Sequence, residues 1–275
     1  MKFNRTIALL CLLLWHLYPA KAQQADTTVV HFIRTLKVGS ATAISTDRSN
    51  SVYFLNSQRN LVKLDSLGKL QHLYSPQTPL GRATTIDAWN PLKILLFNED
   101  RQELLVLDRF LSPITSVLLP DFEINGTVRA AALATDDGFW LFNETDFKLS
   151  KLDMRLRRAV AETSLNLVLD KSRFDVRMLR EYQHQVYLLD YNSGIYVFDN
   201  LGNYKQKLPF TGLSYIGFLN NDLYFVKDGS LHFYDLYKQT TRIIPFQKEK
   251  HYTTALATRN RLYLFSRNAA DVYSW

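Results

Sequence analysis

The sequence predicts an all-β protein, a six-bladed β-propeller built from four-stranded blades. Three observations predict this fold class: a short unit that recurs, a nearly constant spacing between its copies, and strands that are apolar on both faces. The unit is an apolar run, a polar turn, a second apolar run and an aspartate, first seen as Val52–Leu55, Leu61–Leu64 and Asp65. A fixed period of this length, with four short strands per unit, is typical of propellers.

The recurring aspartate marks the period of the repeat. It stands at positions 65, 108, 153, 199 and 235, which are 43, 45, 46 and 36 residues apart. The paired apolar runs of the later copies are 94–97 with 104–107, 139–142 with 149–152, 186–189 with 195–198, and 223–226 with 231–234. A truncated sixth copy, 262–265 with 272–275, ends the chain.

Each unit divides into four strands, lettered A to D from the inner to the outer position. In the first unit they are expected at 42–46, 51–55, 61–64 and 69–74. The later A strands, which are rich in small and β-branched residues as a narrow axis requires, are expected at 84–86, 130–134, 176–179, 215–219 and 253–257. The B strands are apolar at nearly every position, which predicts burial on both faces between neighbouring blades.

The two ends of the chain are expected to meet in the last blade. The sixth unit stops at Trp275 after its C strand, so it lacks a D strand of its own. An unassigned strand-like segment, 29–38, precedes the first blade. We expect this N-terminal strand to complete the last blade and close the ring, because closure removes an exposed sheet edge.

The recurring aspartate has two interpretations, turn chemistry and metal binding. In two copies it leads a turn that ends in glycine, as in Asp65 to Gly68 and Asp199 to Gly202. An aspartate side chain accepts bonds from backbone N–H groups two residues on, and glycine supplies a positive φ. Metal binding would place the carboxylates on separate blades, too far apart to share one ion. Turn chemistry is therefore the favoured interpretation.

These features resemble the six-bladed propellers of the NHL and TolB-like superfamily, in which an aspartate ends strand C and a glycine turn follows. The resemblance covers essentially all of residues 23–275, although the glycine is absent after Asp108, Asp153 and Asp235. It implies the propeller architecture. It also implies a binding platform more often than an enzyme, and it assigns a role to no particular residue.

The first 22 residues are typical of a cleaved secretory signal peptide. Lys2 and Arg5 form a positive start, 7–14 is an apolar stretch, and Ala20-Lys21-Ala22 is a cleavage site. A retained membrane anchor is the alternative. Leu10 before Cys11, the only cysteine, disfavours lipidation. The mature chain, 23–275, is expected to be a single propeller domain without disulfides, thiolate nucleophile or cysteine-ligated zinc.

Charge and hydropathy exclude two classes of partner for the mature chain. Removing residues 1–22 leaves 30 basic and 26 acidic residues, a balance without the basic runs that track nucleic acid. No second apolar stretch approaches the length of about 20 residues that spans a bilayer. The leader indicates export across the inner membrane of a bacterium, with the mature chain periplasmic or associated with the outer membrane.

No catalytic, metal or cofactor motif is recognisable in the chain. The mature histidines, His31, His72, His184, His232 and His251, show no ligand spacing, and hydrolase-elbow and phosphate-loop patterns are absent. The acidic clusters 98–100 and 136–138 fall at expected hairpin tips and do not match a calcium loop. We therefore expect no catalytic residue, metal or cofactor, and interpret the clusters as solvated turns.

The best candidates for a binding site lie just before the A strands, on the face formed by the DA and BC loops. Aligning the repeats places Arg82, Arg129, Asp175 and Tyr252 at equivalent positions, along with Ser40 and Ser214. Arg173 and Lys250 lie close to them in the sequence. Converging guanidinium groups would suit a carboxylate, a phosphate or an acidic peptide. The alternative is that these charges pair with nearby acids.

Two long DA loops, 120–128 and 166–174, carry apolar residues. Phe122, Ile124, Leu167, Val168 and Leu169 either contact a partner or pack onto their own blade.

Two functional hypotheses follow. The favoured one is an exported, non-enzymatic propeller that serves as a protein-interaction platform in the bacterial cell envelope. The alternative is a small-ligand receptor, or a hydrolase or lyase that uses the channel mouth. Asp175 is the one acid among the aligned mouth positions, a weak basis for acid–base chemistry, which needs a placed partner.

Overall fold

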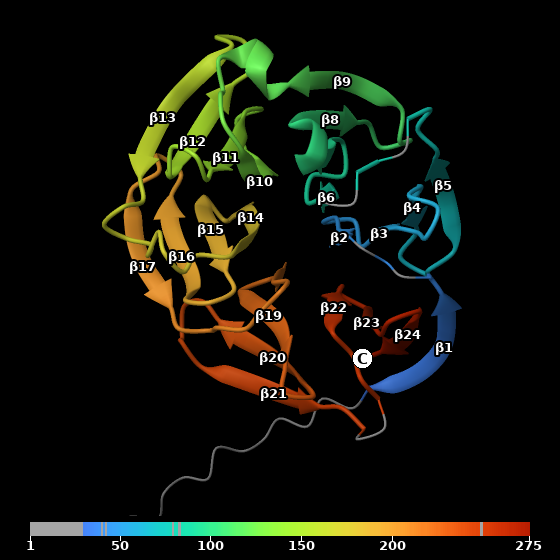
Figure 1. Ribbon diagram of the computed structural model, residues 1–275. Helices are drawn as coiled ribbons and strands as arrows, with labels where there is room; N and C mark the ends of the chain where they lie inside the picture. The colour runs from blue at the N-terminus through green and yellow to red at the C-terminus, as the bar shows by residue number, and fades with distance from the viewer. Residues whose placement is uncertain (1–29, 40, 42, 79, 82–83, 248–249) are drawn as a thin grey trace, which may run out of the picture.

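The computed structural model describes residues 30–275 except 40, 42, 79, 82–83 and 248–249, and it is a six-bladed propeller (Figure 1). The fold class expected from the sequence is confirmed, while the expected signal peptide, 1–22, lies outside the described residues. The blades are, from A to D: β2 (Ile44–Thr46), β3 (Val52–Leu55), β4 (Leu61–Leu64) and β5 (Leu70–Tyr74) in blade 1; β6 (Thr84–Asp87), β7 (Ile94–Asn98), β8 (Glu103–Leu107) and β9 (Pro113–Leu118) in blade 2; and β10 (Val128–Leu133), β11 (Phe139–Asn143), β12 (Lys148–Asp153) and β13 (Arg158–Ser164) in blade 3.

The second half of the ring repeats this arrangement. Its strands are β14 (Val176–Tyr182), β15 (Gln185–Asp190), β16 (Gly194–Asp199) and β17 (Tyr204–Leu208) in blade 4; β18 (Gly217–Leu219), β19 (Asp222–Lys227), β20 (Ser230–Asp235) and β21 (Thr241–Pro245) in blade 5; and β22 (Thr254–Ala257), β23 (Arg261–Phe265), β24 (Ala269–Ser274) and β1 (His31–Lys37) in blade 6.

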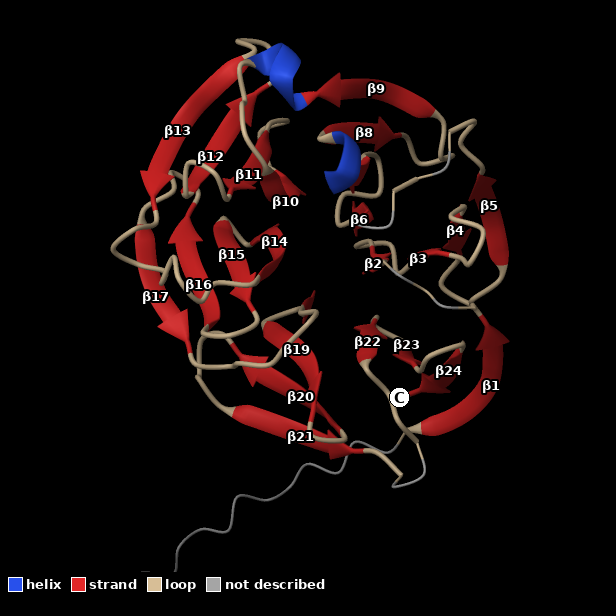
Figure 2. Ribbon diagram, in the orientation of Figure 1, coloured by secondary structure: helices blue, strands red, loops and turns tan. Residues whose placement is uncertain are grey.

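The antiparallel order of each blade defines two faces of the molecule (Figure 2). Successive strands run in opposite directions, so the turn between A and B and the turn between C and D lie on the same side. We call this side the AB face. The BC turns and the DA connections between blades form the opposite side, the BC face.

The core lies between the blades rather than within them. The B strands β3, β7 and β11 are buried at every residue, because each sheet is covered by a neighbour on both faces. A typical inter-blade cluster joins Trp140 and Phe142 of blade 3 to Val176 and Leu179 of blade 4. D strands are half exposed, as in β5 and β13. The two-sided burial explains the continuous apolar runs of the repeat.

The N-terminal strand closes the ring as predicted. β1 pairs antiparallel with β24, from His31 opposite Ser274 to Lys37 opposite Ala269. The Nη2 of Arg34 donates to the carbonyls of Leu67 at 3.1 Å and Gly68 at 2.7 Å, which belong to the CD turn of blade 1. Blade 6 is therefore completed by β1 and joined through it to blade 1 (Figure 1).

The recurring aspartates cap their CD turns, as turn chemistry predicts. In every turn one carboxylate oxygen accepts two backbone N–H groups at 2.7–2.9 Å. Gly68 and Gly202 have φ of 76° and 89°, the left-handed region that glycine tolerates. In the other three turns Leu111, Arg157 and Gln239 occupy that region with φ of 55–65°.

Some element boundaries differ from the sequence prediction. The A strand expected at 215–219 begins at Gly217, and Tyr215 lines the axial cavity from the loop before it. Short 3-10 turns, η1 (Glu99–Arg101) and η2 (Leu119–Phe122), replace the expected irregular loops. Phe122 and Leu169 pack into inter-blade clusters, whereas Leu167 is fully exposed. No helix among the described residues is long and apolar enough to cross a membrane.

Candidate functional site

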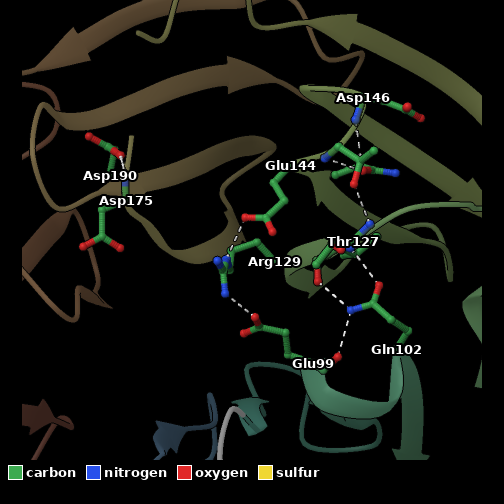
Figure 3. A network of polar contacts seen from close by, with 11 residues as sticks. Glu99, Gln102, Thr127, Arg129, Glu144, Asp146, Asp175 and Asp190 are labelled. Carbon is green, nitrogen blue, oxygen red and sulfur yellow. Dashed lines mark hydrogen bonds and ion pairs between the residues drawn. The ribbon is translucent and has the colours of Figure 1, made fainter. Parts of the chain in front are cut away.

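Arg129, a predicted mouth residue of the BC face, is bound to two carboxylates. It lies near the start of β10, where its Nη1 donates to Glu99 and its Nε donates to Glu144 Oε2 at 3.0 Å. Figure 3 shows the guanidinium between these acids, which come from the BC turns of blades 2 and 3. Burial raises the pKa of Glu99, and Arg129 opposes that shift only in part. The protein itself therefore neutralises the charge of Arg129.

Asp175, before β14, is likewise engaged within its own blade. Its Oδ2 pairs with Arg177 Nη2 at 2.5 Å, and its backbone N–H donates to Asp190 Oδ2 at the end of β15. Arg177 also lies over the ring of Tyr191, 5.3 Å from the centroid. Figure 3 shows Asp175 directed away from Arg129, so the structure does not bring these two candidates into one polar cluster.

Lys250 and Tyr252 share one buried carboxylate. Asp271 of β24 accepts from Lys250 Nζ at 2.7 Å, from the Tyr252 hydroxyl at 2.6 Å and from Thr35 Oγ1 of β1 at 2.6 Å. Only 8% of Tyr252 is exposed, and its hydroxyl forms its hydrogen bond inside the blade. These two candidates are close to each other, and they tie β1 into blade 6.

The remaining two candidates are placed differently. Arg173 is exposed in the DA loop before β14, and its carbonyl accepts from Asn192 Nδ2 at 2.6 Å. Arg82 lies outside the described residues. The described candidates of the BC face thus fall into separate groups, of which that of Arg129 joins blades 2 and 3.

The axial channel widens on the BC side into a cavity of about 210 Å³. Every blade contributes to its wall, through Ala43, Thr85, Ala130, Arg180, Tyr215 and Thr254 among others. The small A-strand residues predicted for the axis leave this space open. Arg177 and Arg180 are among its lining residues, and burial raises the pKa of Tyr215 well above its usual value.

A buried ion pair crosses the channel below this cavity. Arg180 of blade 4 binds Asp87 of blade 2, with Nη1 and Oδ1 2.8 Å apart and both side chains at most 7% exposed. The other oxygen of Asp87 accepts the N–H of Leu133 in blade 3 at 3.0 Å. Arg180 Nε is buried without a hydrogen-bond partner in the described structure. The pair connects three blades across the axis.

On the AB side the channel opens into a mouth pocket of about 350 Å³. Aromatic rings from three blades form its wall. Trp89 meets Tyr182 edge to face with centroids 4.9 Å apart, and Tyr182 stacks on Phe218 at 4.5 Å. Tyr182 and Phe218 are buried, while Trp89 is half exposed, so the indole is the ring that a ligand would meet.

Two arginines lie on the rim of this mouth pocket, Arg48 and Arg259, in the AB turns of blades 1 and 6. Both side chains are exposed, and within the described residues neither guanidinium has a hydrogen-bond or ion-pair partner. Arg259 N–H donates to Asn50 Oδ1 at 3.0 Å, so the two turns are in contact. These arginines differ from Arg129 and Arg177 in that no acid neutralises them directly.

A second AB-side cavity, about 380 Å³, lies between blades 2 and 3. Its apolar wall includes Leu133, Phe139 and Met154, and it shares Arg48 and Trp89 with the mouth pocket. An exposed ion pair, Lys93 with Asp137 at 2.6 Å, lies among its lining residues. The two cavities therefore adjoin one another along the AB face.

The outer part of the AB face carries at least one exposed large apolar side chain per blade at the CD corner, and blades 1 and 2 carry a second, Leu70 and Ile114, at the start of the D strand. We call one corner residue from each blade the apolar ring: Leu67, Phe110, Leu156, Leu201, Tyr237 and, at the start of β1, Phe32, with exposed fractions of 54–69%. Because the blades repeat around the axis, equivalent corners lie at similar heights. In the described BC turns and DA loops the exposed large apolar side chains are Tyr191 and Leu167.

Sequence reasoning missed the AB face, although a signal was present. The third or fourth residue of every turn led by the recurring aspartate is apolar and large. Arg48, Trp89 and Arg259 all follow an A strand within two residues, as an alignment of the AB turns would have shown. The sequence prediction placed the site on the BC face by analogy with other propellers and therefore did not include those positions.

The described histidines are spread over different blades, with His184 in the AB turn of blade 4 and His251 in the loop before β22. His31, His72 and His232 lie on β1, β5 and β20, and His232 stacks on Phe225 with centroids 5.1 Å apart. Burial lowers the pKa of His232. Within the part of the chain that the structure describes, no three His, Cys, Asp or Glu residues are grouped in a way that could hold a metal ion.

Comparison with known proteins identifies the architecture. No family model matches the chain, and no curated protein matches it in sequence. Among solved structures, a catalytically inactive virginiamycin B lyase from Staphylococcus aureus with quinupristin has a TM-score of 0.61 at 8% identity, covering 90% of this chain and 99% of its own. Streptogramin B lyase has a TM-score of 0.57 at 13% identity, covering 90% and 87%.

BamB from Moraxella catarrhalis is also similar, with a TM-score of 0.50 at 12% identity, covering 90% of this chain and 100% of BamB. Identities this low show a shared fold and nothing of function. The chain is a six-bladed β-propeller, as its resemblance to the NHL and TolB-like propellers implied.

Proposed function

We propose that this protein is an exported, non-enzymatic interaction platform that binds a protein partner in the bacterial cell envelope, in the periplasm or at the outer membrane. The observation that carries the proposal is the apolar ring, which presents one exposed large apolar side chain from each blade on the AB face. Export rests on the leader-like residues 1–22.

The apolar ring has the chemistry of a protein interface. Isolated exposed apolar residues are ordinary, but six at equivalent corners of one face form a repeated arrangement. Burying about 50 Å² of apolar surface at each corner would contribute about 1 kcal/mol per corner before the costs of association. A broad partner surface that reaches several corners at once would gain the most from such an arrangement.

Site-specific photocrosslinking in native envelopes tests the platform and its face. A photoreactive phenylalanine analogue replaces Leu201 of the apolar ring in one protein, and Leu167 of the opposite face in a matched control. Both side chains are exposed, at 69% and 101%, and both sit in turns or loops. We expect one discrete crosslinked band from position 201 and none from position 167. Crosslinking from neither position, or equally from both, contradicts the proposal.

Export is tested separately. The full chain is expressed in a Gram-negative host, and the N-terminus of the envelope fraction is sequenced. We expect it to begin at Gln23, after Ala20-Lys21-Ala22. A cytoplasmic protein that keeps its first residues would contradict the export part of the proposal. It would not bear on the proposed binding role of the AB face.

A small-ligand receptor is the second candidate, favoured by the axial cavity on the BC side. Its titratable lining groups are Arg177, Arg180 and Tyr215, and Arg180 Nε is buried without a partner. Both guanidinium groups are already paired with acids, Arg177 with Asp175 and Arg180 with Asp87. The unpartnered Arg180 Nε is therefore the donor that would suit a small anion. Thermal shift with acetate, succinate and phosphate tests this candidate, with Arg180→Met as the variant expected to lose any response.

A further inference from the structure

We propose that the mouth pocket of the AB face binds an acidic peptide segment of the partner, with a carboxylate held between Arg48 and Arg259 and an aromatic side chain against Trp89. The inference rests on the proposed function and names the chemistry of the partner. It places recognition at the centre of the face whose outer corners carry the apolar ring.

The mouth pocket carries positive charge from two arginines. Arg48 and Arg259 line one pocket from adjacent blades, and within the described structure no acid pairs with either guanidinium. The one carboxylate among the lining residues is Asp47, whose oxygens accept the N–H groups of the AB turn and the Tyr53 hydroxyl at 2.8–2.9 Å. The pocket therefore offers two free guanidinium forks, the geometry that binds carboxylates in bidentate fashion.

The mouth pocket also has an aromatic wall. Trp89 is half exposed and is held from behind by Tyr182, which in turn stacks on buried Phe218. A rigid indole supported in this way offers apolar area at little cost in conformational entropy. Aromatic and arginine side chains side by side are the composition of energetic centres in protein interfaces.

The rim is preorganised by contacts between the AB turns. Arg48 N–H donates to the Trp89 carbonyl at 3.3 Å, joining blades 1 and 2, and Arg259 N–H donates to Asn50, joining blades 6 and 1. The Tyr182 hydroxyl donates to the Asn220 carbonyl at 2.6 Å, joining blades 4 and 5. Turns held in place lose little freedom when a ligand binds, which favours affinity.

Shape indicates an extended occupant. The mouth pocket of about 350 Å³ adjoins the cavity of about 380 Å³ between blades 2 and 3, and both are lined by Arg48 and Trp89. Leu133, Phe139 and Met154 of the second cavity could receive a further apolar side chain. A peptide of a few residues fits this elongated depression better than one compact molecule does.

Tryptophan fluorescence of the exported protein gives a local readout. Beyond the leader the tryptophans are Trp89, Trp140 and Trp275, of which Trp140 is fully buried and Trp89 lines the pocket. The probes are three capped tetrapeptides in which phenylalanine alternates with glutamate, glutamine or lysine. We expect the glutamate peptide to change the emission saturably, and the lysine peptide to have no effect. Trp89→Phe should remove the signal.

Arginine variants decide the assignment. Arg48→Gln and Arg259→Gln are each expected to weaken binding of the glutamate peptide about tenfold, the effect of losing one charged hydrogen-bonding partner. Arg267→Gln, an exposed arginine in the BC turn of blade 6, is the matched control and should bind as the unmodified protein does. Circular dichroism confirms that each variant is folded.

Several results would overturn the proposal. Equal binding of the three peptides, no binding up to millimolar peptide, or no effect of the two AB-face variants would each do so. Equal affinity for acetate alone would show a simple anion site in place of a peptide site. Crosslinking at Leu201 that survives Arg48→Gln with Arg259→Gln, together with absent peptide binding, would keep the platform and remove this pocket from it.

Discussion

At the scale of single residues, the aspartate that ends each C strand is a structural device. Its carboxylate accepts two N–H groups of the turn that follows. Hydrogen bonds from backbone N–H groups hold the pKa of Asp153 and Asp235 below the usual range. The pKa of Asp199 is also lowered, chiefly by a hydrogen bond from the Asn203 side chain. These turns also orient the residue that becomes exposed in the apolar ring.

The turn of blade 5 should be improved by glycine. Gln239 has φ of 55° after Asp235 and is exposed, and a left-handed backbone costs a non-glycine residue about 1–2 kcal/mol. Allowing for the greater freedom of glycine in the unfolded chain, we expect Gln239→Gly to stabilise the protein by about 0.5–1 kcal/mol in urea unfolding. Destabilisation would show that the side chain makes a favourable contact. Gln239→Ala, which keeps the strain, is the control.

The buried pair of Arg180 and Asp87 should show strong coupling. Asp87→Asn leaves the guanidinium uncompensated, and we expect a loss of about 3 kcal/mol in urea unfolding. Adding Arg180→Met should recover at least about 1 kcal/mol, because the buried charge is gone. The exposed ion pair of Lys93 with Asp137 is the control, and Lys93→Gln should lower the free energy of unfolding by less than about 1 kcal/mol. Additive losses in the double variant would contradict this account.

At the scale of elements, β1 is held to blade 6 by more than its strand pairing. Asp271 of β24 accepts hydrogen bonds from Thr35 of β1 and from Lys250 and Tyr252 of the loop before β22. Burial by itself would raise the pKa of Asp271, but the hydrogen bonds from Lys250, Thr35 and Tyr252 outweigh it and leave the pKa below its usual value. One carboxylate thus joins β1 to β24, the first and last strands of the described residues.

This network predicts a pH dependence of stability. Because the folded pKa of Asp271 is depressed, its contribution is present above the unfolded pKa of about 4 and is lost as the pH falls through the folded value. Urea unfolding from pH 7 to pH 3 should show a smaller acid loss for Asp271→Asn than for the unmodified protein, starting from a lower stability at pH 7. Parallel curves would show that Asp271 does not contribute in this range.

At the scale of the whole molecule, the ring depends on one strand supplied from the far end of the sequence. β1 completes blade 6, and Arg34 bonds to the CD turn of blade 1, so β1 contacts both sides of the closure. Removing it would expose β24 as an unpaired edge and free the joint between the first and last blades.

Deletion of residues 24–38 should therefore lower the melting temperature sharply or abolish recovery of folded protein. Thermal unfolding followed by circular dichroism measures the shift. Arg34→Gln is a milder variant that keeps the strand and removes the bonds to Leu67 and Gly68, and it should lower the melting temperature by a few degrees. Unchanged melting of the deletion would contradict closure by β1.

The sequence allowed the fold to be predicted nearly in full and the site only in small part. The B strands, the capped turns and the use of 29–38 in closure follow from patterns along the chain. The ion pairs of Arg129 with Glu99 and Glu144 could not be predicted from such patterns, since the two acids come from turns of two different blades. The exposure of Leu201 beside a turn was readable, but its place in a ring of equivalent corners emerges only when the blades are assembled.

The sequence by itself determined the repeat, its period and the chemistry of its turns, because strand burial and turn formation depend on residues that are neighbours along the chain. The tertiary structure decided which charges are free. Arg48 and Arg259 are 211 residues apart, yet they line one pocket from adjacent blades, while Arg129 is neutralised. Electrostatic pairing acts through space over a few ångströms, and only the closed ring sets those distances.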